Sequence, residues 1–152
     1  MKEMKVKKKP IVVAVSGGFD PLHVGHVRLM QEAKRLGDIL VVIVNNDNWL
    51  RKKKGYVFMA ENERAEIIKA LACVDKVILT KHLATPTDMS VVKELRALKP
   101  DIFANGGDRT PITSVSKENI LCRKIGCKTV FNVGHGGKVQ SSSWLVDRAK
   151  KK

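Results

Sequence analysis

Residues 11–38 read IVVAVSGGFDPLHVGHVRLMQEAKRLGD, and this stretch decides the fold. It opens with the continuous apolar run IVVAV (11–15), as expected for a strand that is covered on both faces. The residues from 27 onward have helical spacing, which predicts a helix over 27–36. The segment GGFDPLHVGH (17–26) is therefore a junction between a strand and a helix.

The same alternation continues along the chain. Apolar runs rich in Val and Ile predict strands, and segments with helical spacing lie between them. Ile67, Ile68, Leu71 and Ala72 share one face of the second expected helix, and Asp88 is the expected N-cap of the third. The expected strands are 11–15, 39–44, 76–80, 101–104 and 129–133, and the expected helices are 27–36, 61–73, 88–98, 115–125 and 142–150.

Strands that alternate with helices, without a hairpin signal, predict an α/β fold with a parallel sheet. We expect a single doubly wound, Rossmann-like domain with five parallel strands. Ligands of such sheets bind beyond the carboxyl ends of the strands. Functional residues are therefore expected in the junctions that follow the strands, at 16–26, 45–57, 105–114 and 134–143. The run RKKKG (51–55) is expected on the loop after the second strand.

The composition fits one compact domain with an anionic partner. The chain has 152 residues and a net charge of +14. Much of this charge lies in basic tails, at 1–10 and 149–152, which flank an expected domain over 11–148 and act as solubilising segments. The cysteines Cys73, Cys122 and Cys127 lack CxxC spacing, which argues against a disulfide framework or a zinc site. No apolar run approaches a membrane span, and we expect a reducing cytoplasm.

The opening junction has the chemistry of an anion site. Gly17 and Gly18 let a ligand approach the main chain, and the following helix presents free N–H groups and a positive dipole end. His23 and His26 are three residues apart, so both rings lie on one face at the helix start. Gly25 leaves room between them. A tight turn with polar helix-start histidines is the alternative that the spacing leaves open.

The whole string GGFDPLHVGH resembles the (G/T)xFDxxHxGH signature of the cytidylyltransferase-like nucleotidyltransferase superfamily. The resemblance covers most of the chain and is closest to the glycerol-3-phosphate cytidylyltransferase and heptose-1-phosphate adenylyltransferase branches. It continues through RLGDILVVIVNND (35–47), ENER (61–64), KPDIFANGGD (99–108) and VQSSSWLV (139–146). The chain departs from the cytidylyltransferase branch at GGKVQSSS, where relatives have RTxGISTT. Lys138 supplies charge there without a planar bidentate grip.

The resemblance implies a role for each matching residue. His23 and His26 would stabilise charge on the triphosphate, Lys53 or Lys54 would reach the phosphates, and Arg64 matches the arginine of the family's ER element. The catalytic set is thus His23, His26, Lys53, Lys54 and Arg64. The nucleotide-binding set is Gly17, Gly18, Phe19, Asp20, Gly25, Asn105, Gly107, Asp108, Lys138, Ser141, Ser142 and Ser143.

Several of these residues have a plainer interpretation. Asp20 either shapes its loop or orients a partner. Arg64 could be a surface residue that pairs with Glu61 or Glu63, and Ser141 or Ser142 could cap the last helix. Trp49 and Trp144 lie beside two of the expected ligand loops, where packing and ligand contact are both open.

The function expected from the resemblance is transfer of NMP from CTP or ATP to a phosphorylated small metabolite, such as a sugar or polyol phosphate, with release of pyrophosphate. Mg²⁺ would arrive bound to the nucleoside triphosphate, and the resemblance leaves a homodimer open. No membrane partner is expected, since no apolar run is long enough, and no nucleic-acid partner is expected, since aromatics at 5% offer no stacking platform. Two alternatives remain: adenylyl transfer of the FAD-synthase type, and a noncatalytic binder of nucleotides or nucleic acid.

Overall fold

The structure is a computed structural model that describes residues 8–107, 116–134 and 140–151. A parallel sheet of five strands forms its centre, in the order β3-β2-β1-β4-β5. The predicted doubly wound α/β fold is therefore confirmed. The strands are β1 (Val12–Gly17), β2 (Ile39–Val44), β3 (Lys76–Leu79), β4 (Ile102–Gly106) and β5 (Lys128–Val133).

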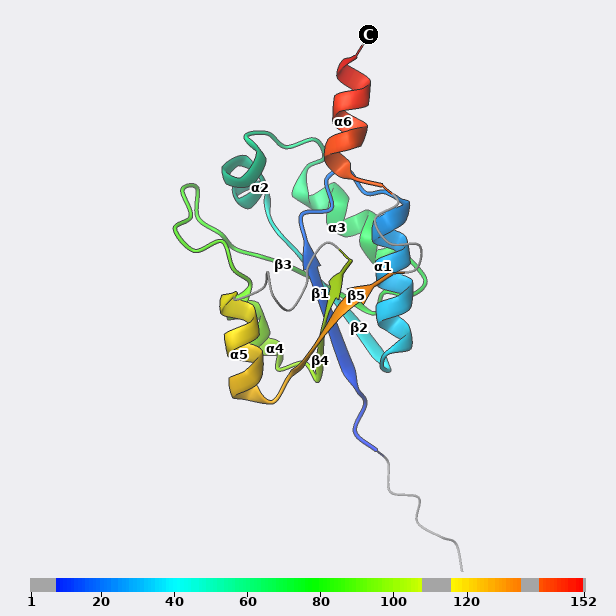
Figure 1. Ribbon diagram of the computed structural model, residues 1–152. Helices are drawn as coiled ribbons and strands as arrows, with labels where there is room; N and C mark the ends of the chain where they lie inside the picture. The colour runs from blue at the N-terminus through cyan, green and yellow to red at the C-terminus, as the bar shows by residue number, and fades with distance from the viewer. Residues whose placement is uncertain (1–7, 108–115, 135–139, 152) are drawn as a thin grey trace, which may run out of the picture.

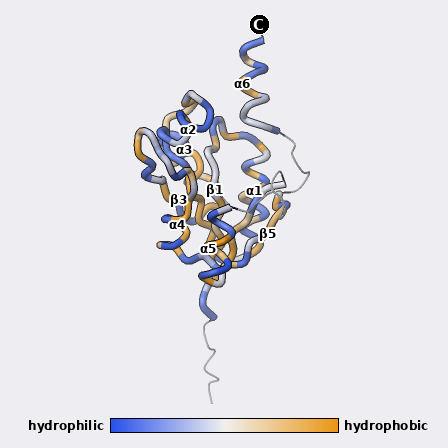
Figure 2. Tube along the Cα trace, turned by 60° about the vertical axis from the view of Figure 1, so that its left-hand side comes forward, coloured by the Kyte–Doolittle hydropathy of each residue, from blue (hydrophilic) through white to orange (hydrophobic). Residues whose placement is uncertain are grey.

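Helices cover both faces of this sheet (Figure 1). The first face packs on α1 (Val24–Arg35) and α3 (Glu61–Lys69), which contribute Met30, Ala33 and Ile68 to its core. The second face packs on α4 (Val92–Leu98) and α5 (Lys117–Ile125), which contribute Leu95 and Leu121. Figure 2 shows the hydrophobic residues gathered in the body of the domain around the sheet.

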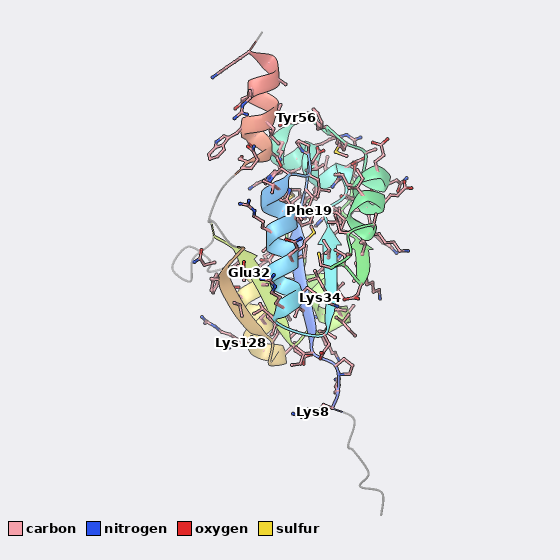
Figure 3. All side chains as sticks on the ribbon, turned by 90° about the vertical axis from the view of Figure 1, so that its right-hand side faces the viewer. Lys8, Phe19, Glu32, Lys34, Tyr56 and Lys128 are labelled. Carbon is pink, nitrogen blue, oxygen red and sulfur yellow. The ribbon has the colours of Figure 1, made fainter. Side chains whose placement is uncertain are left out.

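Two further helices lie beyond the carboxyl ends of the strands. These are α2 (Asp47–Lys54) and α6 (Ser142–Lys150), both toward the top of Figure 1. The Lys150 ammonium lies 5.6 Å from the ring centroid of Tyr56, which Figure 3 shows beside α6. Within the described residues, no helix is both long enough and apolar enough to span a bilayer.

Helix α2 corrects the expectation of a loop at RKKKG. Asn46 is its N-cap and accepts a hydrogen bond from the Trp49 amide at 3.1 Å. Gly55 ends the helix in the left-handed region, at φ +85°. Only Leu50 is buried, so the helix has almost no apolar periodicity to detect.

Other helix boundaries also differ from expectation. Helix α1 begins earlier than predicted, because His23 is its N-cap. Helix α4 begins at Val92 rather than near Asp88, whose carboxylate instead accepts from the Ser90 amide at 2.9 Å. Helix α3 ends at Lys69, and its buried residues are Arg64 and Ile68. Ile67, expected on the buried face, is 42% exposed.

Candidate active site

A cleft of about 310 Å³ lies at the carboxyl ends of β1 and β4. This is where the strand order reverses, the expected ligand position in a doubly wound sheet. The predicted residues that line it are Gly17, Gly18, Phe19, His23, Gly25, His26, Lys54, Asn105, Gly107, Ser141, Ser142 and Ser143. Asp108 and Lys138 lie outside the described residues.

A larger cavity of about 630 Å³ lies along β3, α4 and the segment between them. None of the predicted site residues that the structure describes lines it, and its walls include Ile78, Leu83 and Leu98. The smaller cleft brings together glycine main chain, two histidines and the starts of two helices. These are features of an anion site, so we place the candidate active site in the smaller cleft.

The two histidines of the cleft cap α1 reciprocally. His23 Nδ1 accepts from the Gly25 amide at 3.1 Å, and His26 Nδ1 accepts from the His23 amide at 3.3 Å. This is a capping box built from imidazoles instead of hydroxyl and carboxylate groups. Because each Nδ1 is an acceptor, a neutral ring carries its proton on Nε2. Each Nε2–H is then the group that the ring can offer to a ligand.

Neighbouring groups hold these rings in place. The imidazoles stack with centroids 3.7 Å apart and planes 25° apart. Phe19, shown beside α1 in Figure 3, meets His26 edge-on with centroids 5.0 Å apart. Phe19 is 4% exposed and adopts a positive φ of 52°, which turns the chain between β1 and α1.

Burial and neighbouring cations keep both histidines neutral. Burial, His23 and Lys54 lower the pKa of His26 to about 3. Burial and Lys54 also lower the pKa of His23. The pKa of Lys54 is itself lowered, chiefly by burial. At neutral pH the rings are therefore uncharged hydrogen-bond donors beside the Lys54 ammonium group.

Helix α6 brings a second helix start to the cleft. Ser141 is its N-cap residue and makes no side-chain capping bond, while Ser142 donates its Oγ–H to the Pro21 carbonyl at 2.8 Å. Neither Ser141 nor Ser142 is thus used as a side-chain cap. Neither of the described helices α1 and α6 has an acidic residue in its first turn. Both helix ends therefore favour an anion.

On the side of β4 and β5, the cleft wall is shaped by a β-bulge. The register of these strands shifts between Ala104 and Gly106, and Asn132 has a φ of +57°. A Cβ on Gly107 would lie 2.9 Å from Asn132 Oδ1, the end of an exposed side chain that can move aside. Asn105 is 6% exposed, and its Nδ2 has no partner among the described residues.

Trp49 forms the opposite wall, toward β2. Its Nε1–H donates to the Met89 carbonyl at 2.9 Å, which fixes the ring. A Cβ on Gly18 would lie 3.2 Å from Trp49 Cζ3. The indole therefore both packs against the glycine turn and faces the cleft. In the sequence, only the position of Trp49 directly after the second strand indicated that it could line the cleft.

Among the predicted site residues with a described position, Lys53, Asp20 and Arg64 do not line the cleft. Lys53 is exposed on α2, so of the two candidate lysines the structure brings Lys54 to the site. Asp20 is fully buried and accepts from the Phe58 and Met59 amides at 2.7 and 2.6 Å. Asp20 thus shapes its loop, which was one of its two interpretations.

Arg64 is also fully buried. The alternative of a surface arginine paired with Glu61 or Glu63 is therefore wrong, because its acidic partner is Asp47 at 2.8 Å. The burial reflects its position on α3, one turn before Ile68, on the face that packs against the sheet.

Comparison with known proteins agrees with this geometry. The family model described as cytidylyltransferase-like matches residues 14–130. The chain belongs to the cytidylyltransferase-like family. The resemblance carried by GGFDPLHVGH is thereby confirmed.

Individual cytidylyltransferase-like relatives differ in length. The chain is 42% identical over 118 residues to the bifunctional protein HldE of Syntrophotalea carbinolica, a match that covers 76% of the chain and 23% of that protein. It is 39% identical over 125 residues to the FAD synthase of Thermococcus sibiricus, covering 82% of the chain and 81% of that protein. The chain thus spans about a quarter of the HldE relative.

A solved structure shares the fold of this cytidylyltransferase-like domain. The lipopolysaccharide core biosynthesis protein of Thermoplasma volcanium superposes with a TM-score of 0.67 at 32% identity. The match covers 84% of this chain and 99% of that protein.

Proposed function

We propose that the protein transfers NMP from a nucleoside triphosphate to the phosphate of a small metabolite and releases pyrophosphate. The observation that carries this proposal is the imidazole capping box, which leaves two Nε2–H donors at a cleft made of glycine main chain, helix starts and Lys54. Such a cleft suits a polyphosphate.

The proposed reaction forms one P–O bond and breaks another. An oxygen of the acceptor phosphate attacks the α-phosphorus, and the bond from that phosphorus to the bridging oxygen breaks. Negative charge then develops on the departing pyrophosphate. Phosphoryl-type transfer needs mainly positioning and charge stabilisation. His23, His26 and Lys54 would supply both, because their donors are held in place before the ligand arrives.

Magnesium would enter with the nucleotide. The described residues that line the cleft include no carboxylate, and no group of three or more His, Cys, Asp or Glu in the described parts of the chain could hold a metal. The triphosphate oxygens are therefore the proposed ligands of Mg²⁺.

The acceptor we propose is a sugar or polyol phosphate, and ATP or CTP is the donor. Polar groups on the cleft wall, from Asn105, Gln140 and Ser141–Ser143, suit a hydroxyl-rich ligand. A second candidate acceptor is FMN, because the chain is similar to an FAD synthase over 81% of that protein.

The test measures pyrophosphate release by the full chain with Mg²⁺. Each of the four nucleoside triphosphates is combined with sugar phosphates, glycerol 3-phosphate and FMN, and His26→Ala is the inactive control. Release that depends on ATP or CTP and on one acceptor class supports the proposal. No release above the control, in any combination, refutes it. Nucleotide binding that survives alanine at both histidines and weakens steeply with salt would instead indicate a noncatalytic basic binder.

A further inference from the structure

Arg64 donates hydrogen bonds to three different segments of the chain. Its Nε–H donates to the Met59 carbonyl at 2.9 Å. Its Nη1 donates to the carbonyls of Gly18 at 2.7 Å and Asn45 at 2.6 Å. Its Nη2 donates to Asp47 Oδ1 at 2.8 Å. The guanidinium is 0% exposed, so all of these bonds are shielded from water.

Two carbonyls and the carboxylate bound by Arg64, those of Gly18, Asn45 and Asp47, belong to segments that carry cleft residues. Gly18 follows β1 and lines the cleft directly. Asn45 follows β2, and Asp47 is the first residue of α2. Helix α2 carries Trp49 and Lys54 to the cleft. Arg64 therefore ties the glycine turn to the helix that bears the lysine.

Asp20 completes the arrangement from the other side. Its carboxylate accepts from the Phe58 and Met59 amides, while Arg64 binds the Met59 carbonyl. The backbone of Met59 is thus held at both its N–H and its C=O. The Asp20 carbonyl also accepts from Lys54 Nζ at 3.2 Å. The position of that ammonium group depends on the same segments.

We propose that Arg64 is a positioning residue, which fixes the turn after β1, the start of α2 and the segment before α3 relative to one another without touching substrate. Moving its guanidinium to a phosphate would leave three carbonyls and a carboxylate without their donor. Buried groups that lose their partners are costly. A lysine cannot replace the planar fork, because it offers one compact ammonium group. The kinetic consequence rests on the proposed nucleotidyl transfer.

The first experiment compares Arg64→Lys, Asp47→Asn and the double variant, with Arg96→Lys on the exposed face of α4 as the matched control. All are assayed at a temperature where thermal unfolding shows every variant folded. We expect kcat to fall about 100-fold in Arg64→Lys, since small misplacements of reacting groups have effects of this size. KM for the nucleotide should change by less than about 3-fold, and the double variant should lose less than the product of the single losses.

Two kinetic results would overturn the inference. A large rise in KM with little change in kcat would mean that Arg64 binds the nucleotide itself. Unchanged kcat and KM would mean that it contributes to stability alone. Asp47→Asn retains an oxygen acceptor, so this milder variant keeps the test valid if Arg64→Lys does not fold.

The second experiment needs no activity. Amide hydrogen exchange is measured by NMR for the wild type and Arg64→Lys. Exchange should rise at Phe58, Met59 and the first turn of α2, while amides of β4 and β5 keep their protection. A uniform rise across the domain, or no change, would refute the positioning role. If the wild type transfers no nucleotide to any acceptor, the proposed function fails, and the exchange data still decide whether Arg64 fixes these segments.

Discussion

Each histidine at the start of α1 has two nitrogens with different tasks, and the tasks can be separated by substitution. Nδ1 caps the helix, whereas Nε2 is left for a ligand. Asparagine places an acceptor near the position of Nδ1 but has no counterpart of Nε2. We therefore predict that His23→Asn and His26→Asn lose activity while they keep the cap, and that the alanine variants lose both.

The expected losses of stability and of kcat follow from the capping bond and the ligand donor that each variant removes. Loss of a capping bond costs about 1 kcal/mol. For 152 residues at about 2.1 cal/mol/K each, the unfolding entropy is about 320 cal/mol/K, so the alanine variants should melt about 3 °C lower. Loss of one donor to a developing negative charge costs a factor of about 10² to 10³ in kcat. The asparagine and alanine variants should therefore be equally impaired in kcat.

The assays are pyrophosphate release at saturating nucleotide and thermal unfolding without nucleotide, with Arg96→Lys as the control. Asparagine variants that keep activity within about 3-fold of the wild type would show that the Nε2–H groups do not stabilise the transition state. Asparagine variants that melt as low as the alanine variants would show that the Nδ1 bonds are not the source of the lost stability.

Three further predictions follow from the same cleft. In the folded protein, burial and then His23 and Lys54 lower the pKa of His26 from 6.5 to about 3. Between pH 3 and pH 6.5, this histidine is therefore protonated in the unfolded chain and neutral in the folded protein. Stability should fall as pH falls from 6.5 to 3, by up to about 1.4 kcal/mol per pH unit, and His26→Asn should flatten that dependence in thermal unfolding. Gly25→Ala would place a Cβ 2.9 Å from His23 Cε1 and displace that ring, so kcat should fall about 10-fold or more. The melting temperature should stay within a few degrees, since alanine also favours the helix. Lys54→Ala should raise KM for the nucleotide about 10-fold through loss of a charge-assisted bond. In the control Lys53→Ala, which changes an exposed residue, KM should stay within about 2-fold of the wild type. Equal effects of the two variants on KM would contradict the placement of Lys54 at the cleft.

The strands and the cleft position could be predicted because their signals are local. Strands buried on both faces appear as continuous apolar runs, such as ILVVIV in β2. The junction after β1 could be recognised because a glycine turn, a helix start and HxxH spacing occur together. The capping role of the histidines was not predicted, because the helix was expected to begin at residue 27 and a capping box normally pairs Ser or Thr with Glu or Gln.

The features that the sequence did not predict depend on contacts between distant residues. Asp20 binds amides 38 and 39 residues away, and Arg64 binds a carbonyl 46 residues away. No spacing rule reports such pairings. Helix α2 was missed for a different reason, since a short helix with one buried residue and four basic residues at its end shows no apolar stripe.

Four polar residues of the GGFDPLHVGH and ENER motifs form hydrogen bonds that hold the backbone around the cleft, whatever contacts they make with the proposed ligand. His23 and His26 each use one nitrogen on an amide, and Asp20 and Arg64 use their polar groups on amides, carbonyls and Asp47. An alanine substitution at any of these positions removes a scaffold bond together with any ligand contact. Loss of activity in such a variant therefore cannot assign a catalytic role. Only substitutions that keep the scaffold bond, such as asparagine for these histidines, separate the contact with substrate from the support of the cleft.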